Sequence, residues 1–207
     1  LHKGSTVSIG STRYASFLDA KRKSAKPTGR DVTRSDVHPM LHDWQVEIVQ
    51  WACRVGRAAI WADTGLGKTL MQIEWVRLMA GDGIGLIVAP LAVCHQTIKE
   101  AARVGVPATY VRSGDGLGPG IYVTNYEMLD HFDPTTVRAI VLDEASILKA
   151  SAGKTRTKLI AHFAETSYRL ACTATPAPND VEELTNQAEF LGVTTRVNML
   201  AAYFVHD

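Results

Sequence analysis

The residues best suited to chemistry form a short glycine-containing loop between an apolar segment and an amphipathic one. The loop consists of Thr64, Gly65, Leu66, Gly67, Lys68 and Thr69. The glycines let the backbone curl so that successive N–H groups face one point, and a helix that begins at Lys68 would direct the positive end of its dipole there. The Lys68 ammonium can then reach phosphate oxygens, and the Thr69 hydroxyl can ligate Mg²⁺. The pattern predicts a phosphate-binding loop of a nucleotide site.

This loop departs from the strict G-x-x-x-x-G-K-[ST] pattern at one position, because Ala62 stands where the pattern has its first glycine. The alternative is a glycine-rich turn that merely contains a lysine. The apolar strand before the loop, the helix after it and the Lys-Thr pair in register favour the phosphate loop.

An acidic pair, Asp143 and Glu144, follows a second apolar segment. One carboxylate at the end of a strand suits Mg²⁺, and its neighbour suits the polarisation of an attacking water. We assign Asp143 to the metal and Glu144 to the water as general base. Alone, such a pair would be read as a solvated loop. Its place after a phosphate loop in an α/β pattern favours a catalytic role.

The elements that must position these groups alternate along the chain. Apolar runs predict buried strands at residues 58–62, 85–89, 109–111, 121–124, 139–142 and 169–174. Amphipathic patterns predict helices at 68–79, 92–104, 154–164 and 181–191. Strands buried on both faces and separated by helices indicate an α/β domain with a mostly parallel sheet and helices on both faces. Its functional loops should follow the carboxyl ends of the strands.

A further helix is expected from His42 to the stop signal at Gly56. Its apolar face is predicted from residues spaced by three and four positions. These are Trp44, Ile48, Trp51, Ala52 and Val55.

The bulk composition is that of a globular protein, with 46% hydrophobic and 21% charged residues and a net charge of +1. Residues 1–39 hold eight Lys and Arg against three Asp and Glu, which predicts a basic N-terminal arm, with a short helix at about 14–23. The three cysteines lack metal-ligand spacing and indicate small buried side chains in a reducing compartment. No apolar run is long enough to cross a membrane, so the expected location is cytoplasmic.

With these features in place, the sequence resembles the superfamily-two helicases, and among them the Swi/Snf-type DNA translocases, especially phage and prophage members. The resemblance covers about residues 41–207. Residues 41–45 are similar to the adenine-reading element, which makes Gln45 the candidate for hydrogen bonds to adenine. Residues 87–91 resemble a strand-end motif that touches the nucleic-acid backbone, and this similarity points to Pro90 and Leu91.

Two later segments complete the resemblance. Residues 123–127 look like the next backbone-contact motif, which implicates Thr124 and Asn125. Residues 173–176, with Asn179 and 182–184, resemble the motif that couples the ATP state to nucleic acid. Its candidate contacts are Thr173 and Thr175. Ser146 replaces the His or Asp that ends the acidic motif in most relatives.

The resemblance implies a RecA-like ATP-binding lobe over residues 40–191, followed at 192–207 by a helical protrusion or a linker to a second lobe outside this chain. It further implies ATP and Mg²⁺ as cofactors and DNA, in duplex form, as partner, in a bacterial or phage-infected cell. Weak self-association through the apolar 192–207 segment is a further expectation. Because the second lobe carries the arginine finger, we expect this chain alone to hydrolyse ATP more slowly than about one turnover per second.

An alternative function stays open: a nucleic-acid-binding or regulatory module that keeps the fold without productive hydrolysis. A kinase with a phosphate loop is disfavoured, because it would leave the 173–176 segment and Gln45 without a role.

Overall fold

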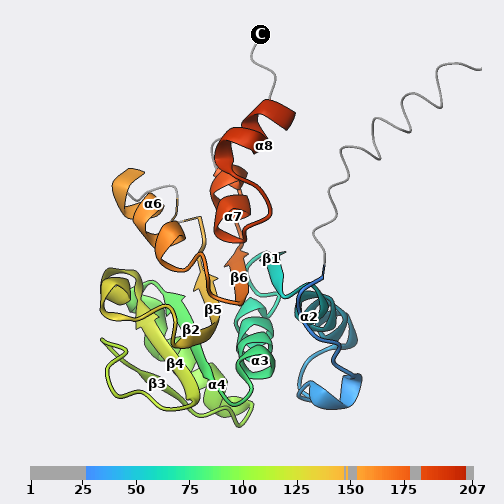
Figure 1. Cartoon of the computed structure of the whole chain (residues 1–207). Coiled ribbons are helices and arrows are strands. Elements are labelled where there is room, and N and C mark those ends of the chain that lie inside the picture. The colour runs from blue at the N-terminus through green and yellow to red at the C-terminus, as the bar shows by residue number, and fades with distance from the viewer. Residues whose placement is uncertain (1–26, 147, 149–152, 178–182, 204–207) are drawn as a thin grey trace, which may run out of the picture.

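The computed structural model describes residues 27–146, 148, 153–177 and 183–203 (Figure 1). Six parallel strands form one sheet in the order β1-β6-β5-β2-β4-β3. The strands are β1 Arg57–Trp61, β2 Ile84–Ala89, β3 Ala108–Tyr110, β4 Gly120–Asn125, β5 Val137–Asp143 and β6 Tyr168–Thr173. All six predicted strands are present, and the predicted α/β, RecA-like fold is confirmed.

Helices connect most of these strands. They are α2 Asp43–Val55, α3 Lys68–Ala80, α4 Leu91–Arg103, α6 Gly153–His162, α7 Leu184–Phe190 and α8 Arg196–Tyr203, with 3-10 turns η1 Arg34–Asp36 and η2 Tyr126–His131. Helices α3, α4, α6 and α7 lie where helical patterns were predicted, with ends shifted by a few residues as is usual at helix termini. α7 begins at Leu184, and the earlier part of the predicted 181–191 helix lies outside the described residues.

Successive strand residues point to opposite faces of the sheet, and both faces are covered. In β2, Ile87 packs in the core cluster that contains α2, α3 and α4. Its neighbours Leu86 and Val88 pack in the second cluster, with η2, α6 and α7. The near-continuous apolar runs of the strands follow from this two-sided burial.

Helix α2 presents a different face to the core than its spacing predicted. Its buried residues are Gln45, Val46, Val49, Ala52 and Cys53. Trp44 and Trp51, predicted to be buried, are 42% and 46% exposed. The buried side of α2 packs against α3, and its small and β-branched side chains allow a close approach that two indole rings would prevent. The predicted apolar face of this helix is therefore wrong at Trp44 and Trp51, whereas Ala52 is buried and Ile48 and Val55 are half-buried against the core.

The predicted basic arm, residues 1–39, is only partly described. Its first 26 residues, including the expected helix at 14–23, lie outside the described residues. From Pro27 the chain packs on α2, where backbone N–H groups of residues 28–30 donate to the carbonyls of residues 53–55 at 2.9–3.2 Å. The buried apolar side chains that follow are Val32, Val37 and Leu41. The packed body therefore includes the described part of the arm.

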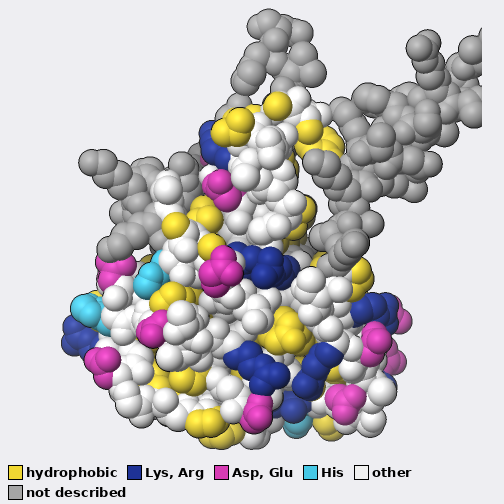
Figure 2. Space-filling model, in the orientation of Figure 1, with side chains coloured by type: hydrophobic (Ala, Val, Ile, Leu, Met, Phe, Trp, Pro, Cys, Tyr) yellow, Lys and Arg dark blue, Asp and Glu magenta, His cyan; other side chains and the backbone are white. Residues whose placement is uncertain are grey.

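The C-terminal helix α8 lies beyond the carboxyl ends of the strands (Figure 1). None of its residues is buried. Val197 and Tyr203 are exposed large apolar residues, and Figure 2 shows apolar side chains on the surface around this helix. Within the predicted apolar segment at 192–207, residues 196–203 form this helix, and residues 192–195 are irregular.

Two expectations from composition can be compared with the structure. Cys53, Cys94 and Cys172 are buried free thiols, as predicted, and burial raises the pKa of Cys53 to about 12. Among the described residues, no helix combines the length and the apolar character that a membrane-spanning segment needs.

Candidate functional site

The phosphate loop lies where strand β1 passes into helix α3, and its backbone has the predicted curl. Gly65 and Gly67 have φ values of +82° and +69°, which favour glycine. Lys68 Nζ donates to the Ala62 carbonyl oxygen at 3.0 Å, which holds the ammonium over the loop. Ala62 N–H in turn donates to the Thr173 carbonyl at 3.3 Å. The alanine that replaces the first glycine of the pattern is therefore compatible with the loop.

The loop and the acidic pair face one cavity. It has a volume of about 430 Å³ and is open to solvent. Lys68, Thr69, Asp143 and Glu144 all line it. The sheet order explains their meeting, because β1 and β5 flank β6 and all three strands end at the same edge. The structure thus brings the two strongest motifs of the sequence together.

The backbone at Glu144 is held in an unusual conformation. Among the described residues, it is the one non-glycine residue with a positive φ, at 55°. Its N–H donates to Asp143 Oδ1 at 3.2 Å, and its Oε2 accepts a hydrogen bond from Thr173 Oγ1 at 3.4 Å. A left-handed conformation costs a side chain of this kind on the order of 1–2 kcal/mol, and such strain gathers at functional sites. The conformation aims the Glu144 carboxylate along the strand ends toward Thr173.

This strain predicts an inverted order of stability at position 144. We expect Glu144→Gly to be more stable to urea unfolding than Glu144→Ala by about 1 kcal/mol, because glycine has no Cβ penalty at positive φ. The matched control is Glu47, an exposed residue of helix α2, where the alanine variant should be the more stable by about 1 kcal/mol. The same order at both positions would contradict the left-handed conformation.

Asp143 is 5% exposed, and burial raises the pKa of its carboxyl group above the ordinary value. Burial has the largest effect; the Glu144 charge raises this pKa further, while Gln72, Lys68 and the Glu144 N–H lower it. Gln72 is fully buried one turn after Lys68; its amide lies close enough to Asp143 to lower the pKa of that carboxyl group, although neither amide atom makes a hydrogen bond of normal geometry. The oxygens of Thr69 and Asp143, which line the same cavity, fit a hydrated Mg²⁺.

A raised carboxyl pKa means that the ionised Asp143 destabilises the metal-free fold. We expect Asp143→Asn to stabilise the metal-free protein at pH 7.5 by on the order of 0.5–2 kcal/mol. The folded protein holds the Asp143 proton more tightly than the unfolded chain does. The wild type should therefore recover this difference as the pH falls through the raised pKa. Urea unfolding of wild type and variant in EDTA, at pH 7.5 and at a pH below the raised pKa, measures this stability difference. An Asp143→Asn variant less stable than wild type at pH 7.5 would contradict this account.

Gln45 lies in a second cavity of about 410 Å³ that adjoins the first. The cavity is lined by Met40, His42, Trp44, Gln45, Gly65, Leu66, Gly67, Leu70 and Arg103. Gln45 is 4% exposed; its Oε1 accepts from His42 N–H at 2.9 Å and its Nε2 donates to the Leu66 carbonyl at 3.0 Å. A Cβ at Gly67 would collide with this amide. The predicted adenine-reading residue is therefore fastened to the phosphate loop.

Helix α4 contributes residues that the sequence did not single out. Val93, Gln96, Glu100 and Arg103 line the cavity of the phosphate loop, and Arg103 also lines the second cavity. Arg103 Nη1 donates to Glu100 Oε2 at 2.7 Å. The four residues are spaced by three and four positions, which places them on one face of α4. Nothing in the sequence indicates that this face lies against the phosphate loop.

The candidate nucleic-acid contacts fall into two groups. Leu91 is 58% exposed at the start of α4, next to Pro90. Thr124 and Asn125, in contrast, are buried. Thr124 Oγ1 donates to the Val111 carbonyl at 2.8 Å, and the Asn125 amide is hydrogen-bonded to Tyr110 and Glu127. A contact with nucleic acid at Thr124 and Asn125 would therefore use their backbone atoms.

The segment from Thr173 to Pro176 is connected to the rest of the site by side chains. Thr173 is buried, and its Oγ1 accepts from Thr175 N–H at 3.1 Å, while Thr175 is exposed. Trp61 Nε1 at the end of β1 donates to Gln187 Oε1 at 2.9 Å, and Gln187 Nε2 donates to the Pro176 carbonyl at 3.0 Å. This connection was not predicted. The predicted Asn179 and Glu182 lie outside the described residues.

A family model described as SNF2-related domain matches residues 44–198. The fold is similar to the Sulfolobus solfataricus SWI2/SNF2 ATPase core in complex with dsDNA, at 21% sequence identity and a TM-score of 0.68, over 83% of this chain and 40% of that chain.

Two further solved structures share the fold. The Pyrococcus furiosus Hef helicase domain matches at 18% identity and a TM-score of 0.59, over 73% of this chain and 37% of that chain. The UvsW helicase from bacteriophage T4 matches at 14% identity and a TM-score of 0.58, over 86% of this chain and 65% of that chain. This chain thus spans less than two thirds of the length of each structure.

Proposed function

The chain belongs to the SNF2-related domain family, and from that premise we propose that it is the ATP-binding lobe of a DNA-dependent ATPase of the helicase or translocase type. One observation carries the proposal. The phosphate loop and the acidic pair line one cavity at the ends of neighbouring strands, and Glu144 of that pair accepts a hydrogen bond from Thr173 on the strand between them. A nucleotide site and the segment expected to sense nucleic acid are therefore in direct contact.

The polar groups of the phosphate loop and the acidic pair each have a role in the proposed hydrolysis. Bound Mg²⁺–ATP would supply the phosphoanhydride bond and the neutralising cation. The Lys68 ammonium and the loop N–H groups would bind phosphate oxygens, and Thr69 Oγ1 and the Asp143 carboxylate would hold the cation. The Glu144 carboxylate would orient the attacking water and accept its proton at Oε, as the water oxygen bonds to the γ-phosphorus and the phosphoanhydride bond to ADP breaks.

The Glu144–Thr173 hydrogen bond is a candidate for the coupling between the two ligands. In this chain Ser146 stands where most relatives have His or Asp, yet Glu144 itself reaches Thr173 at 3.4 Å. A shift of the Glu144 side chain on loss of the γ-phosphate would first change its hydrogen bond with Thr173. From there it would pass to the exposed Thr175, whose N–H is bonded to Thr173.

Duplex DNA is the proposed partner, because the similar SWI2/SNF2 core was solved with dsDNA. The proposed contacts are the exposed strand-end loops, with Leu91, Pro90 and Thr175, and the backbone at Thr124 and Asn125. Charges of both signs are interspersed on the face shown in Figure 2. The contact should therefore depend on particular loops more than on a broad basic surface.

A second RecA-like lobe is proposed to complete the site. The cavity of the phosphate loop is open to solvent, and the family resemblance places an arginine finger on that lobe. Weak self-association through the exposed Val197 and Tyr203 of α8 is proposed as a lesser interaction.

The rate of ATP hydrolysis by the whole protein, measured with and without duplex DNA, tests this function. We expect DNA to stimulate hydrolysis at least tenfold. ATP binding without any hydrolysis would favour the alternative of a regulatory module. Hydrolysis indifferent to every nucleic acid offered would contradict the motor function.

A further inference from the structure

A buried carboxylate outside the site described so far lies on the middle of helix α3. Of the carboxylates that the structure describes, only Asp143 and Glu74 are buried, and the Glu74 side chain is 0% exposed. Glu74 Oε1 and Oε2 accept from Arg77 Nε and Nη2 at 3.1 and 2.8 Å, and Oε2 also accepts from the His38 N–H at 3.0 Å. A buried charge is costly, so this one is expected to have a directional role beyond packing.

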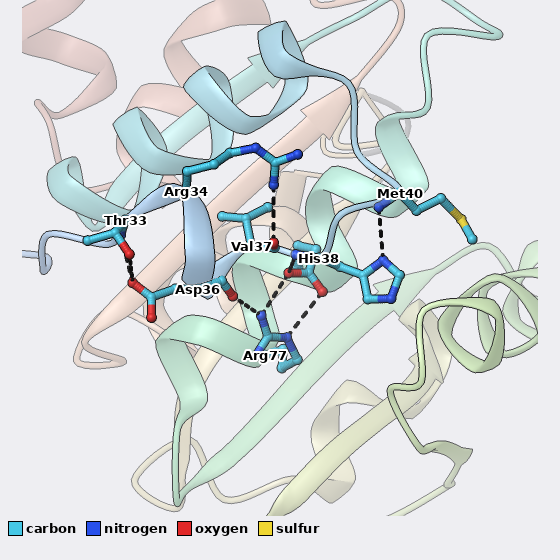
Figure 3. Close-up of polar contacts among 8 residues, drawn as sticks. Thr33, Arg34, Asp36, Val37, His38, Met40 and Arg77 are labelled. Atoms are coloured by element: carbon cyan, nitrogen blue, oxygen red, sulfur yellow. Dashed lines mark hydrogen bonds and ion pairs between the residues drawn. The ribbon is translucent and has the colours of Figure 1, made fainter.

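One partner of Glu74, the His38 N–H, belongs to an irregular segment that precedes α2, and the other, Arg77, lies one turn further along α3. Arg77 Nη2 also donates to the Asp36 carbonyl at 2.5 Å, so the Glu74–Arg77 pair fastens the segment at two backbone positions (Figure 3). Next along the chain, Met40 N–H donates to His38 Nδ1 at 3.2 Å (Figure 3). Residues 37–42 lie in neither helix nor strand, so these polar anchors act together with the burial of Val37 and Leu41 to hold the segment.

The same segment forms one wall of the second cavity. Met40, His42, Trp44 and Gln45 all line that cavity. At its far end the segment is tied to the phosphate loop, through the Gln45 bonds to the His42 N–H and the Leu66 carbonyl. This wall of the second cavity is therefore held at two places. Gln45 ties it to the phosphate loop before α3, and Glu74 ties it to the middle of α3.

We infer that Glu74 is a positioning residue for the pocket that receives the base of the nucleotide, and this inference rests on the proposed ATP site. The carboxylate fixes the His38 backbone and, with it, the placement of Met40 and His42 against the base. It does not touch the phosphate loop. Loss of the Glu74 carboxylate should therefore reduce the part of the ATP affinity that comes from the base. The part that comes from the phosphates should not change.

The experiment compares two ligands that differ in the nucleoside. Dissociation constants of Mg²⁺–ATP and Mg²⁺–tripolyphosphate are measured by calorimetry for wild type and Glu74→Gln. The amide oxygen of Gln can still accept from the His38 N–H, but the charge that orients Arg77 is gone. We expect ATP to bind about 5- to 30-fold more weakly to the variant and tripolyphosphate to change less than about threefold.

Two further variants keep the result interpretable. Arg77→Lys retains the ion pair but loses the forked contact with both Glu74 and Asp36, and it should show the same ATP-selective loss to a smaller degree. Asp82→Asn removes an exposed carboxylate that pairs with Arg138 away from both cavities, and it should change neither constant. If Glu74→Gln does not fold, Arg77→Lys decides the question.

The outcomes separate the inference from the proposed function. Equal weakening of ATP and tripolyphosphate, or no weakening of either, overturns the role of Glu74 and leaves the ATP site intact. Wild type that binds both ligands equally well also overturns it, because the base then contributes nothing. Wild type that binds neither ligand overturns the proposed function and the inference together.

Discussion

Replacement of Glu144 by Gln is expected to slow ATP cleavage by about 10²–10⁴-fold while ATP affinity changes by less than about threefold. The glutamine side chain has nearly the same shape and can still accept the hydrogen bond from Thr173. It cannot take a proton from water, so only the chemical step should be affected. Single-turnover cleavage with protein in excess over ATP measures that step directly, even where the rate is low.

The control for Glu144→Gln is Glu47→Gln, which removes one exposed carboxylate on α2 and should cleave ATP as the wild type does. Two results would contradict the role of Glu144 as general base. One is cleavage by Glu144→Gln at the wild-type rate. The other is a slower rate fully explained by weaker ATP binding.

Truncation of Lys68 to Ala is expected to weaken ATP binding by about 10- to 150-fold, the equivalent of one charged hydrogen bond of about 1.5–3 kcal/mol. In the structure its ammonium donates to the Ala62 carbonyl and lines the cavity shared with the acidic pair. The fold should tolerate the change, because the group lies at an open cavity. Equilibrium titration with Mg²⁺–ATP measures the affinity.

Lys99→Ala is the matched control for Lys68, since it removes the same charge from an exposed position on helix α4. Its ATP affinity should equal that of the wild type. Equal affinities of wild type and Lys68→Ala would rule out the 64–69 loop as the phosphate site. A parallel loss in both lysine variants would instead point to a general electrostatic effect.

The phosphate loop and the acidic pair could be located from sequence because each depends on a local pattern. A strand end, a curl of glycines and a helix start fix the direction of Lys68 and Thr69 whatever packs around them. Asp143 likewise follows a strand that is buried on both faces. Parallel strands end at one edge, so the meeting of these groups followed from the predicted fold.

Features set by packing between elements were not predictable in this way. Helix α2 carries two possible apolar faces, and only the close fit to α3 selects Val46 and Val49 over Trp44 and Trp51. The face of α4 that brings Arg103 to both cavities is likewise decided by the way this helix packs. In such cases periodicity establishes the helix but leaves its rotation open.

Glu74 and Glu144 show a second limit of sequence reasoning. A glutamate inside an amphipathic helix ordinarily indicates a solvated position, and no spacing rule distinguishes Glu74 from such a residue. The left-handed backbone of Glu144 depends on its neighbours along the strand ends, where Ala145 N–H donates to the Cys172 carbonyl at 2.8 Å. Both features require knowledge of which parts of the chain are adjacent in the fold: the segment before α2 for Glu74, and strand β6 for Glu144.

The central claim is that this chain binds ATP with Mg²⁺ at the 64–69 loop, and calorimetric titration of the wild-type chain tests it most directly. The account predicts one binding site per chain, with affinity for ATP that falls when Mg²⁺ is removed by EDTA and falls further in Lys68→Ala. Absence of saturable binding at millimolar Mg²⁺–ATP by a chain shown to be folded would contradict it.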